Sequence, residues 1–424
     1  MMTADALHFE SPRGMRDFYP EDMDLRNAVF DAWARAARGF GFAQYDACVV
    51  ESLELLKRKS GEEIVEQIYA FKDKSDRDLA LRPEMTPTLA RMIAARQGQL
   101  AFPLKWFAIA QCFRYERTTK GRKREHYQWN LDIVGEDSLG AEAEILACAI
   151  AALNALALDD RDFQIHFNSR ALLAELLMKA DIQSQNHAAV FLALDKRGKI
   201  PDPEIALLLQ QAGLDKNAVE QVFRLMAINT VEEARSFLAA ETPALKAVEE
   251  LPRRLAGYGL DKYLRFNVGV VRGLGYYTGI VFEAYDVERK LRAIFGGGRY
   301  DRLLKDMGGS ELTAVGLGFG DVVIADLLRD KGKIPSGADR VDLAIGFMDD
   351  AQRSAAVRLA LAWRAEGKQV DLGLHSEKPK HFFGRVGKGG VAQAVFLGPD
   401  DVAAGSARVK NLRDRTEMQV KLAD

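Results

Sequence analysis

Cysteine is scarce in this chain, and no stretch of it is both long and apolar. Its three cysteines, Cys48, Cys112 and Cys148, are widely spaced and form no Cys-x-x-Cys pair. This spacing argues against a disulfide framework or a cysteine zinc site, and it fits a reducing compartment. No apolar run reaches the length of a membrane span, and residues 1–12 do not resemble a signal peptide. We therefore expect a cytoplasmic protein with no membrane partner.

An excess of positive charge is also missing, since the formal net charge is −2 and the isoelectric point is about 6.4. A nucleic acid would therefore have to bind at local basic patches. The histidines form no His-Glu-x-x-His or His-x-x-x-His pair, so we expect neither a metal site nor a Ser-His-Asp triad. The glycine-rich turns lack the flanking parallel strand and later acidic residue that a dinucleotide site requires.

The most informative stretch is a pair of β-prone segments, 104–114 and 127–134, that flank a basic turn. Because side chains alternate along a strand, we expect Gln128, Asn130 and Asp132 on one face of the hairpin. Arginines at such a tip suit a polyphosphate, and an amide beside a carboxylate suits a small polar ligand. A solvated charged hairpin is the alternative interpretation. The tip contains five cations: Arg117, Lys120, Arg122, Lys123 and Arg124.

The order of the expected elements predicts an α+β protein with an antiparallel, β-rich domain over residues 1–330. Residues 169–259 have only helical patterns and are expected to form a helical insertion into that domain. A strand is expected at 291–295, ending at a run of three glycines. Residues 331–338 have the composition of a linker, and 339–424 alternate strands with helices, which predicts a small α/β domain.

Two further segments combine polar side chains with turn-forming residues. Glu84 and Thr86 precede an expected helix, so Thr86 is predicted to cap it, while Glu84 also suits an ammonium or imidazolium group. Arg272, Tyr276 and Tyr277 lie in a glycine-punctuated turn, where backbone and ligand can approach closely. A tight hairpin between two strands is the simpler explanation of that turn.

Taken in order, these segments resemble the histidyl-tRNA synthetases, which are class II aminoacyl-tRNA synthetases. The resemblance covers nearly the whole chain and implies a class II catalytic domain followed by an anticodon-binding-like α/β domain. It rests on five segments: Gly-Met-Arg-Asp at 14–17, Arg-Pro-Glu-Met-Thr at 82–86, Phe-Arg-x-Glu at 113–116 continued by Arg124, Gln128 and Asp132, Arg-Gly-Leu and Tyr-Tyr-Thr-Gly within 272–279, and Gly-Gly-Arg-Tyr-Asp at 297–301.

The resemblance also implies roles for single residues. Arg114 would hold the α-phosphate of ATP, Glu116 the adenine side and Arg122 the pyrophosphate end. Arg272 would lie near the attacking carboxylate, so Arg114 and Arg272 are the expected catalytic residues. The expected histidine-binding residues are Glu84, Thr86, Gln128, Asp132, Tyr276 and Tyr277.

The implied reaction begins with in-line attack of the histidine carboxylate on the α-phosphorus of ATP, giving histidyl-adenylate and pyrophosphate. Fixed cations and Mg²⁺ would stabilise the charge that develops. Histidine then passes to tRNA(His), and a homodimer is expected. A basic stretch at 378–388 is a candidate tRNA contact in the C-terminal domain, with a solvated helix face as the alternative.

Two positions depart from the family pattern. Cys48 stands where the first class II motif usually has proline, and Val323 stands where the third motif has the arginine that grips the γ-phosphate. If the enzyme is active, another cation must substitute. The candidates are Lys120, Arg122, Lys123 and Arg124 in the hairpin tip, which we expect to close over the β- and γ-phosphates, with Arg122 carrying the largest effect.

The loss of that arginine keeps open a non-catalytic regulatory subunit of ATP phosphoribosyltransferase. Arg114, Gln128, Arg272 and the C-terminal domain favour the synthetase. A synthetase-like RNA-binding module would not need so complete a histidine pocket.

Overall fold

The computed structural model describes residues 10–59, 66–198, 200–272, 276–306, 308–334 and 341–422. The chain forms two compact units, Met1–Pro335 and Ser336–Asp424. Half of the expected linker, residues 335–338, lies outside the described residues. None of the helices in the described ranges is both long and apolar enough to cross a membrane.

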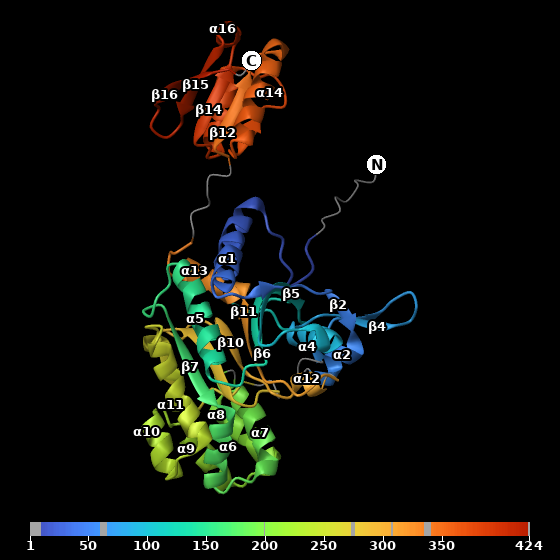
Figure 1. The fold of residues 1–424 in the computed structure, drawn as a ribbon, viewed down its shortest axis with the longest axis vertical. Helices are drawn as coiled ribbons and strands as arrows, with labels where there is room; N and C mark the ends of the chain where they lie inside the picture. The colour runs from blue at the N-terminus through green and yellow to red at the C-terminus, as the bar shows by residue number, and fades with distance from the viewer. Residues whose placement is uncertain are drawn as a thin grey trace, which may run out of the picture. The chain divides into compact units, whose positions relative to one another are not determined.

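A mostly antiparallel sheet of eight strands forms the centre of the first unit (Figure 1). In spatial order its strands are β1 (Ala43–Gln44), β5 (Leu104–Phe113), β6 (Glu125–Val134), β11 (Ala314–Gly320), β10 (Phe295–Arg299), β9 (Ile280–Asp286), β7 (Phe163–Ser169) and β8 (Leu264–Phe266). Within the described residues of this sheet, only the terminal pairs β1–β5 and β7–β8 are parallel. The expected α+β fold with an antiparallel sheet is confirmed.

Helices α1 (Pro20–Gly39), α5 (Gly140–Ala155) and α13 (Asp321–Asp330) pack beside this sheet (Figure 1). The apolar side chains that alternate along β6 point to this side, where Trp33 of α1 stacks on Trp129 with ring centroids 5.8 Å apart. Trp33 also lies 5.0 Å from the ring of Phe319 on β11. Burial of these aromatic rings fixes which face of β6 is apolar, and it leaves the polar face for a ligand.

The expected helical insertion is present as six helices between β7 and β8. Capping side chains begin several of them, since Ser169, Thr230 and Thr242 accept hydrogen bonds from backbone amides in the first turn. Together the helices bury an apolar core that continues from the sheet. They are α6 (Arg170–Lys179), α7 (Ser184–Asp195), α8 (Asp202–Gln211), α9 (Lys216–Leu225), α10 (Val231–Leu238) and α11 (Pro243–Ala256).

A smaller antiparallel sheet is formed by strands that precede β5 in the chain, and the last of them leads into the segment that carries Glu84. Its strands are β2 (Val50–Ser52), β4 (Asp78–Leu81) and β3 (Ala70–Lys72). Helices α2 (Leu53–Lys59) and α4 (Thr86–Arg96) adjoin it. Short helix α12 (Leu303–Asp306) contacts α4, and single 3₁₀ turns follow α4 and α11 at Gln97–Gln99 and Asp261–Tyr263.

The strand expected at 291–295 is wrong, because β10 begins only at Phe295 and runs through the three glycines. A Cβ on Gly297 would lie 2.1 Å from the carbonyl oxygen of Gly316, and a Cβ on Gly298 would lie 2.6 Å from that of Ile280. Neighbouring strands therefore pack against β10 too closely for side chains. The pattern suggested a turn, whereas the glycines form a central strand.

The second unit contains a five-stranded sheet flanked by helices. Its strands in spatial order are β13 (Val370–Leu372), β12 (Leu343–Phe347), β14 (Gln393–Leu397), β15 (Ser406–Asn411) and β16 (Glu417–Lys421). Parallel pairing joins β12 to β13 and β14, while β15 and β16 are antiparallel. The helices are α14 (Asp350–Ala365), α15 (Pro379–Lys388) and α16 (Pro399–Ala403). The sequence pattern predicts the α/β order but neither β16 nor α16.

Candidate active site

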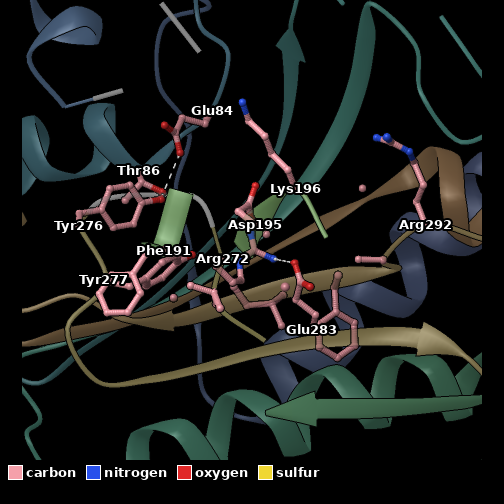
Figure 2. Close-up of a pocket in the computed structure, with 18 of the residues that line it drawn as sticks. Glu84, Thr86, Phe191, Asp195, Lys196, Arg272, Tyr276, Tyr277, Glu283 and Arg292 are labelled. Carbon is pink, nitrogen blue, oxygen red and sulfur yellow. Dashed lines mark hydrogen bonds and ion pairs between the residues drawn. The ribbon is translucent and has the colours of Figure 1, made fainter. Parts of the chain in front are cut away.

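A cavity of about 2320 Å³ opens on the polar face of the eight-stranded sheet. It gathers the expected histidine-binding residues and the expected ATP contacts Arg114, Glu116 and Arg122, and Figure 2 shows part of its lining. These residues come from the β4–α4 loop, the β5–β6 hairpin and the turn before β9. They are Glu84, Thr86, Arg114, Glu116, Arg122, Gln128, Asp132, Arg272, Tyr276 and Tyr277.

Asp132 projects from β6 into this cavity and is almost completely buried. The hydroxyl of Tyr300 donates to Oδ1 at 2.6 Å, while Oδ2 has no hydrogen-bond partner among the described residues. Burial raises the pKa of Asp132 to about 7, although the hydrogen bond from Tyr300 opposes the shift. A buried carboxylate with one unsatisfied oxygen is poised to accept a hydrogen bond from a ligand.

Glu84 forms the second carboxylate of the cavity, and it is also buried. The hydroxyl of Tyr276 donates to Oε2 at 3.4 Å, and Oε1 has no partner within the described ranges. Burial raises the pKa of Glu84, and the charge of Arg114 is the largest effect in the opposite direction. The pocket therefore holds two carboxyl groups with one unpartnered oxygen each.

Thr86 does not cap α4, so that prediction is wrong. Met85 occupies the N-cap position in an αR conformation without a capping side-chain bond, and Thr86 is the first helical residue. The side chain of Thr86 instead lines the cavity beside Tyr276 (Figure 2). Its position follows from α4 beginning one residue earlier than the Thr-Pro pattern suggests.

The polar face of β6 carries a short hydrogen-bonded row next to Asp132. Gln128 donates through Nε2 to Oδ1 of Asn130 at 3.0 Å, and Nε2 of His126 lies 3.3 Å from Oε1 of Gln128. Burial lowers the pKa of His126 to about 3, with a further contribution from Arg114, so the ring is neutral at pH 7. The row holds the Gln128 amide in place. The sequence pattern predicted Asn130 on this face, but it did not indicate His126.

Arg114 links the hairpin to the segment that carries Glu84. Its Nε donates to the carbonyl oxygen of Pro83 at 3.0 Å, and its backbone amide bonds to the carbonyl oxygen of Arg124. Glu116 and Arg122 form an ion pair further along the same hairpin. These contacts set Arg114 beside the segment that carries Glu84, and a charged pair toward the hairpin tip.

Arg272 is held in an unusual backbone conformation with φ of 55°. Its Nη1 donates to Oε1 of Glu283 at 3.0 Å (Figure 2). A Cβ on Gly296 would lie only 1.6 Å from Nη1, so the guanidinium crosses a point of β10 where only glycine fits. A non-glycine residue held in the left-handed backbone region is uncommon and is often found at functional sites. The neighbouring residues 273–275 of the expected motif lie outside the described residues.

The N-terminal segment at 14–17 supports the site without lining the cavity. Arg16 bonds to Glu125 at 2.6 Å and to Asp321 at 2.9 Å, so it ties the start of β6 to the start of α13. The carbonyl oxygen of Gly14 accepts the backbone amide of Arg124 at 2.9 Å. The sequence pattern alone did not indicate this role, because the bonded partners lie far away in the chain.

The raised pKa of Asp132 makes a prediction about stability. Between about pH 4 and 7 the folded protein holds a proton that the unfolded chain has lost, so this group destabilises the fold progressively as pH rises. Asp132→Asn keeps the acceptor for Tyr300 and removes the charge. We expect it to stabilise the free protein at pH 8 relative to pH 5, by about 2–3 kcal/mol.

Urea unfolding of wild type and variant at both pH values measures this difference. A stability difference that is the same at pH 5 and pH 8 would show that Asp132 does not titrate in this range.

The residues from 14 to 320 match the family model described as histidyl-tRNA synthetase. A histidine–tRNA ligase of Arabidopsis thaliana, named chloroplastic/mitochondrial, is 40% identical over 97% of this chain and 85% of its own length. A histidine–tRNA ligase of Opitutus terrae is also 40% identical, over 97% of this chain and 96% of its own.

The crystal structure of a histidyl-tRNA synthetase from Nostoc has the same fold, with a TM-score of 0.82 at 22% identity over 98% of this chain and 97% of that one. By the family model and by these full-length relatives, the chain belongs to the histidyl-tRNA synthetase family.

Proposed function

We propose that this chain is a histidine–tRNA ligase that activates histidine with ATP and transfers it to tRNA(His). The observation that carries the proposal is the pair of buried carboxylates, Glu84 and Asp132, each with an oxygen that lacks a partner among the described residues. Histidine offers one cationic ammonium and one ring N–H, which match two such acceptors. Arg114 and Arg272 lie in the same cavity, next to the place where a carboxylate would be activated.

In the proposed first step, the histidine carboxylate attacks the α-phosphorus of ATP. A bond forms between the carboxylate oxygen and phosphorus, and the bond to the bridging oxygen breaks as pyrophosphate leaves. Arg114 contacts the α-phosphate, and Arg272 orients the attacking carboxylate while Glu283 holds its guanidinium. Cations fixed in advance stabilise the developing charge without reorganisation.

The histidine side chain is proposed to bind among Thr86, Gln128, Tyr276 and Tyr277. The two tyrosine rings lie 4.8 Å apart and form one wall of the cavity (Figure 2). Burial raises the pKa of both tyrosines above the ordinary value, so their hydroxyls are neutral at pH 7. Neutral hydroxyls and an amide provide hydrogen bonds that recognise an imidazole without adding charge.

ATP is proposed to bind along the hairpin, with Glu116 on the adenine side and Arg122 toward the pyrophosphate end. No group of three or more metal-ligating side chains gathers among the described residues. Mg²⁺ commonly binds through substrate phosphates with only one or two carboxylates, so we propose that it enters with ATP. It would neutralise the phosphate charges there.

The tRNA is proposed to bind in part through the second unit, as the resemblance to an anticodon-binding domain implies. Helix α15 carries Lys380, His381, Arg385 and Lys388, a local basic stretch on a chain of nearly neutral charge. Arg385 is already paired with Glu377 at 2.6 Å, which lowers its availability for phosphate.

We further propose a homodimer formed through the N-terminal part of the first unit. The small sheet there exposes Val50 and Phe71, and Val49 beside it is also exposed. Exposed apolar side chains that cluster on one surface are typical of an interface. Cys48, at the position where the family pattern has proline, is exposed near these residues. Its sulfur lies 3.8 Å from Nη2 of Arg91, and this contact helps to hold the segment in place.

A non-catalytic regulatory subunit is the second candidate, because Val323 replaces an arginine of the third motif. The relatives that match nearly the whole chain are named histidine–tRNA ligases, and Arg114 and Arg272, the proposed catalytic residues, both line the cavity. The ligase is therefore the better supported function.

Exchange of labelled pyrophosphate into ATP, with and without histidine, tests the proposal. We expect exchange that depends on histidine and that no other amino acid supports, followed by charging of tRNA(His). Exchange that stays at background with histidine present would exclude the ligase and favour the regulatory subunit.

A further inference from the structure

Val323 lies in the cavity wall at the position where the third motif of the family has an arginine. It follows β11 on the first turn of α13, is largely buried and still contributes to the cavity wall. A Cβ built on Gly121 at the hairpin tip would lie 3.5 Å from Cγ2 of Val323. The hairpin tip and α13 therefore meet at Val323, next to the expected pyrophosphate end of ATP.

Arg292 reaches the same point from a different part of the chain. The same Cβ on Gly121 would lie 3.8 Å from Cδ and 3.9 Å from Cγ of Arg292, so the stem of this arginine runs beside Val323. Arg292 lines the cavity and is exposed to it. Figure 2 shows Arg292 at the end of the pocket away from Glu84, Tyr276 and Tyr277. This placement suits the phosphate end and not the histidine end.

The backbone before Arg292 is fixed by a buried carboxylate. Asp286 at the end of β9 accepts the backbone amides of Lys290 and Leu291, each at 2.9 Å. The amide of Ile294 bonds to the carbonyl oxygen of Ala284 at 2.7 Å. Arg292 thus lies in a loop anchored on both sides, which lowers the entropic cost of presenting its guanidinium to a ligand.

Several cations of the hairpin tip are engaged elsewhere. Arg122 pairs with Glu116, and Lys120 lies 3.2 Å from Asp330 on α13. The guanidinium of Arg124 stacks 3.9 Å over the ring of Tyr115. Arg122 remains a predicted pyrophosphate contact, but its partner neutralises part of its charge. Three of the tip cations are therefore already paired, while Lys123 also lines the cavity.

We propose that Arg292 is a catalytic residue that contacts the γ-phosphate of ATP in place of the arginine absent at Val323. This inference rests on the proposed ligase function and concerns the same reaction. As the bond between the α-phosphorus and its bridging oxygen breaks, the electron pair and negative charge move onto the departing pyrophosphate. The guanidinium of Arg292 stabilises that charge from the β9–β10 loop. The cation that binds the γ-phosphate then comes from the β9–β10 loop and not from α13.

Arg292→Ala is expected to lower kcat/KM for ATP in pyrophosphate exchange by about 10- to 100-fold, the range for one exposed but directed cation. Arg292→Lys should recover part of this loss. The sharper test moves the charge back: Val323→Arg in the Arg292→Ala background should restore exchange at least tenfold, about one cation contact. The same change in wild type should add little.

Binding of AMP and ATP, measured by calorimetry, separates a phosphate contact from a loss of structure. Arg292→Ala should weaken ATP and leave AMP unchanged, because AMP has no γ-phosphate. Lys290→Ala is the matched control, since Lys290 is exposed in the same loop, pairs with Glu288 and does not line the cavity.

An active wild type whose ATP kinetics and ATP affinity survive Arg292→Ala would overturn this inference while leaving the ligase function intact. Equal weakening of AMP and ATP would also overturn it, since that pattern indicates a structural role. A wild type without histidine-dependent exchange would instead refute the function on which the inference rests.

Discussion

Histidine binding is expected to weaken by about 30- to 4000-fold in Glu84→Gln and in Asp132→Asn. Each substitution removes one buried carboxylate charge and leaves a cationic or N–H group of the ligand without its partner. Truncating one member of a buried charge pair costs about 2–5 kcal/mol, which corresponds to this range. Both side chains are buried, so water cannot easily replace the lost contact.

Calorimetric titration with histidine measures the loss, and an analogue assigns the two carboxylates. The charge of Arg114, the proposed α-phosphate contact, lowers the pKa of Glu84, whereas the pKa of Asp132 is set by burial and by Tyr300. Arg114 therefore lies nearer to Glu84. The activated carboxylate and the adjacent ammonium should therefore lie toward Glu84, and the ring toward Asp132. Imidazole-propionate lacks the ammonium, so Glu84→Gln should bind it nearly as wild type does.

Glu311→Gln serves as the control, because this exposed carboxylate pairs with Lys305 and does not line the cavity. Unchanged histidine affinity in both Glu84→Gln and Asp132→Asn would remove the basis of the proposed histidine pocket.

Formation of histidyl-adenylate is expected to slow by about 10²- to 10³-fold in Arg272→Ala and in Arg114→Ala, the effect of removing one directed donor from a developing oxyanion. The loss should appear in the rate at saturating substrates, because both arginines act on the reacting groups. The guanidinium of Arg272 is oriented by its hydrogen bond to Glu283 and by its close packing against Gly296. Glu283→Gln, which keeps the cation but weakens its anchor, should cause a smaller loss.

Rapid-quench measurement of the first turnover, with substrates in excess over KM, separates this chemical step from product release. Arg253→Ala is a control, since this arginine is exposed on α11 and does not line the cavity. Variants of Arg272 and Arg114 that reach the wild-type rate at saturation would mean that these arginines contribute only to binding.

Much of the fold was predictable because the signals are local. The alternation along 127–134 correctly separated the polar face of β6 from the apolar one, and the helical insertion followed from periodicity. Predictions were wrong where the conformation depends on how closely distant segments pack. The glycines of β10 suggested a turn, because local sequence does not show that neighbouring strands leave no room for a Cβ. Thr86 looked like a helix cap for the same local reason.

Residue types and their spacing indicate much of the candidate site, since the expected histidine-binding residues and the expected ATP contacts Arg114, Glu116 and Arg122 line the cavity described above. The contacts that hold these residues in place depend on how distant segments pack together. Tyr300 bonds to Asp132 from 168 positions away, and Arg16 bridges to Asp321 from 305 positions away. Arg292 meets the gap at Val323 through the packing of separate loops. Residue types and their spacing encode local conformation, whereas such pairings depend on strand register and chain crossing, which no local pattern contains.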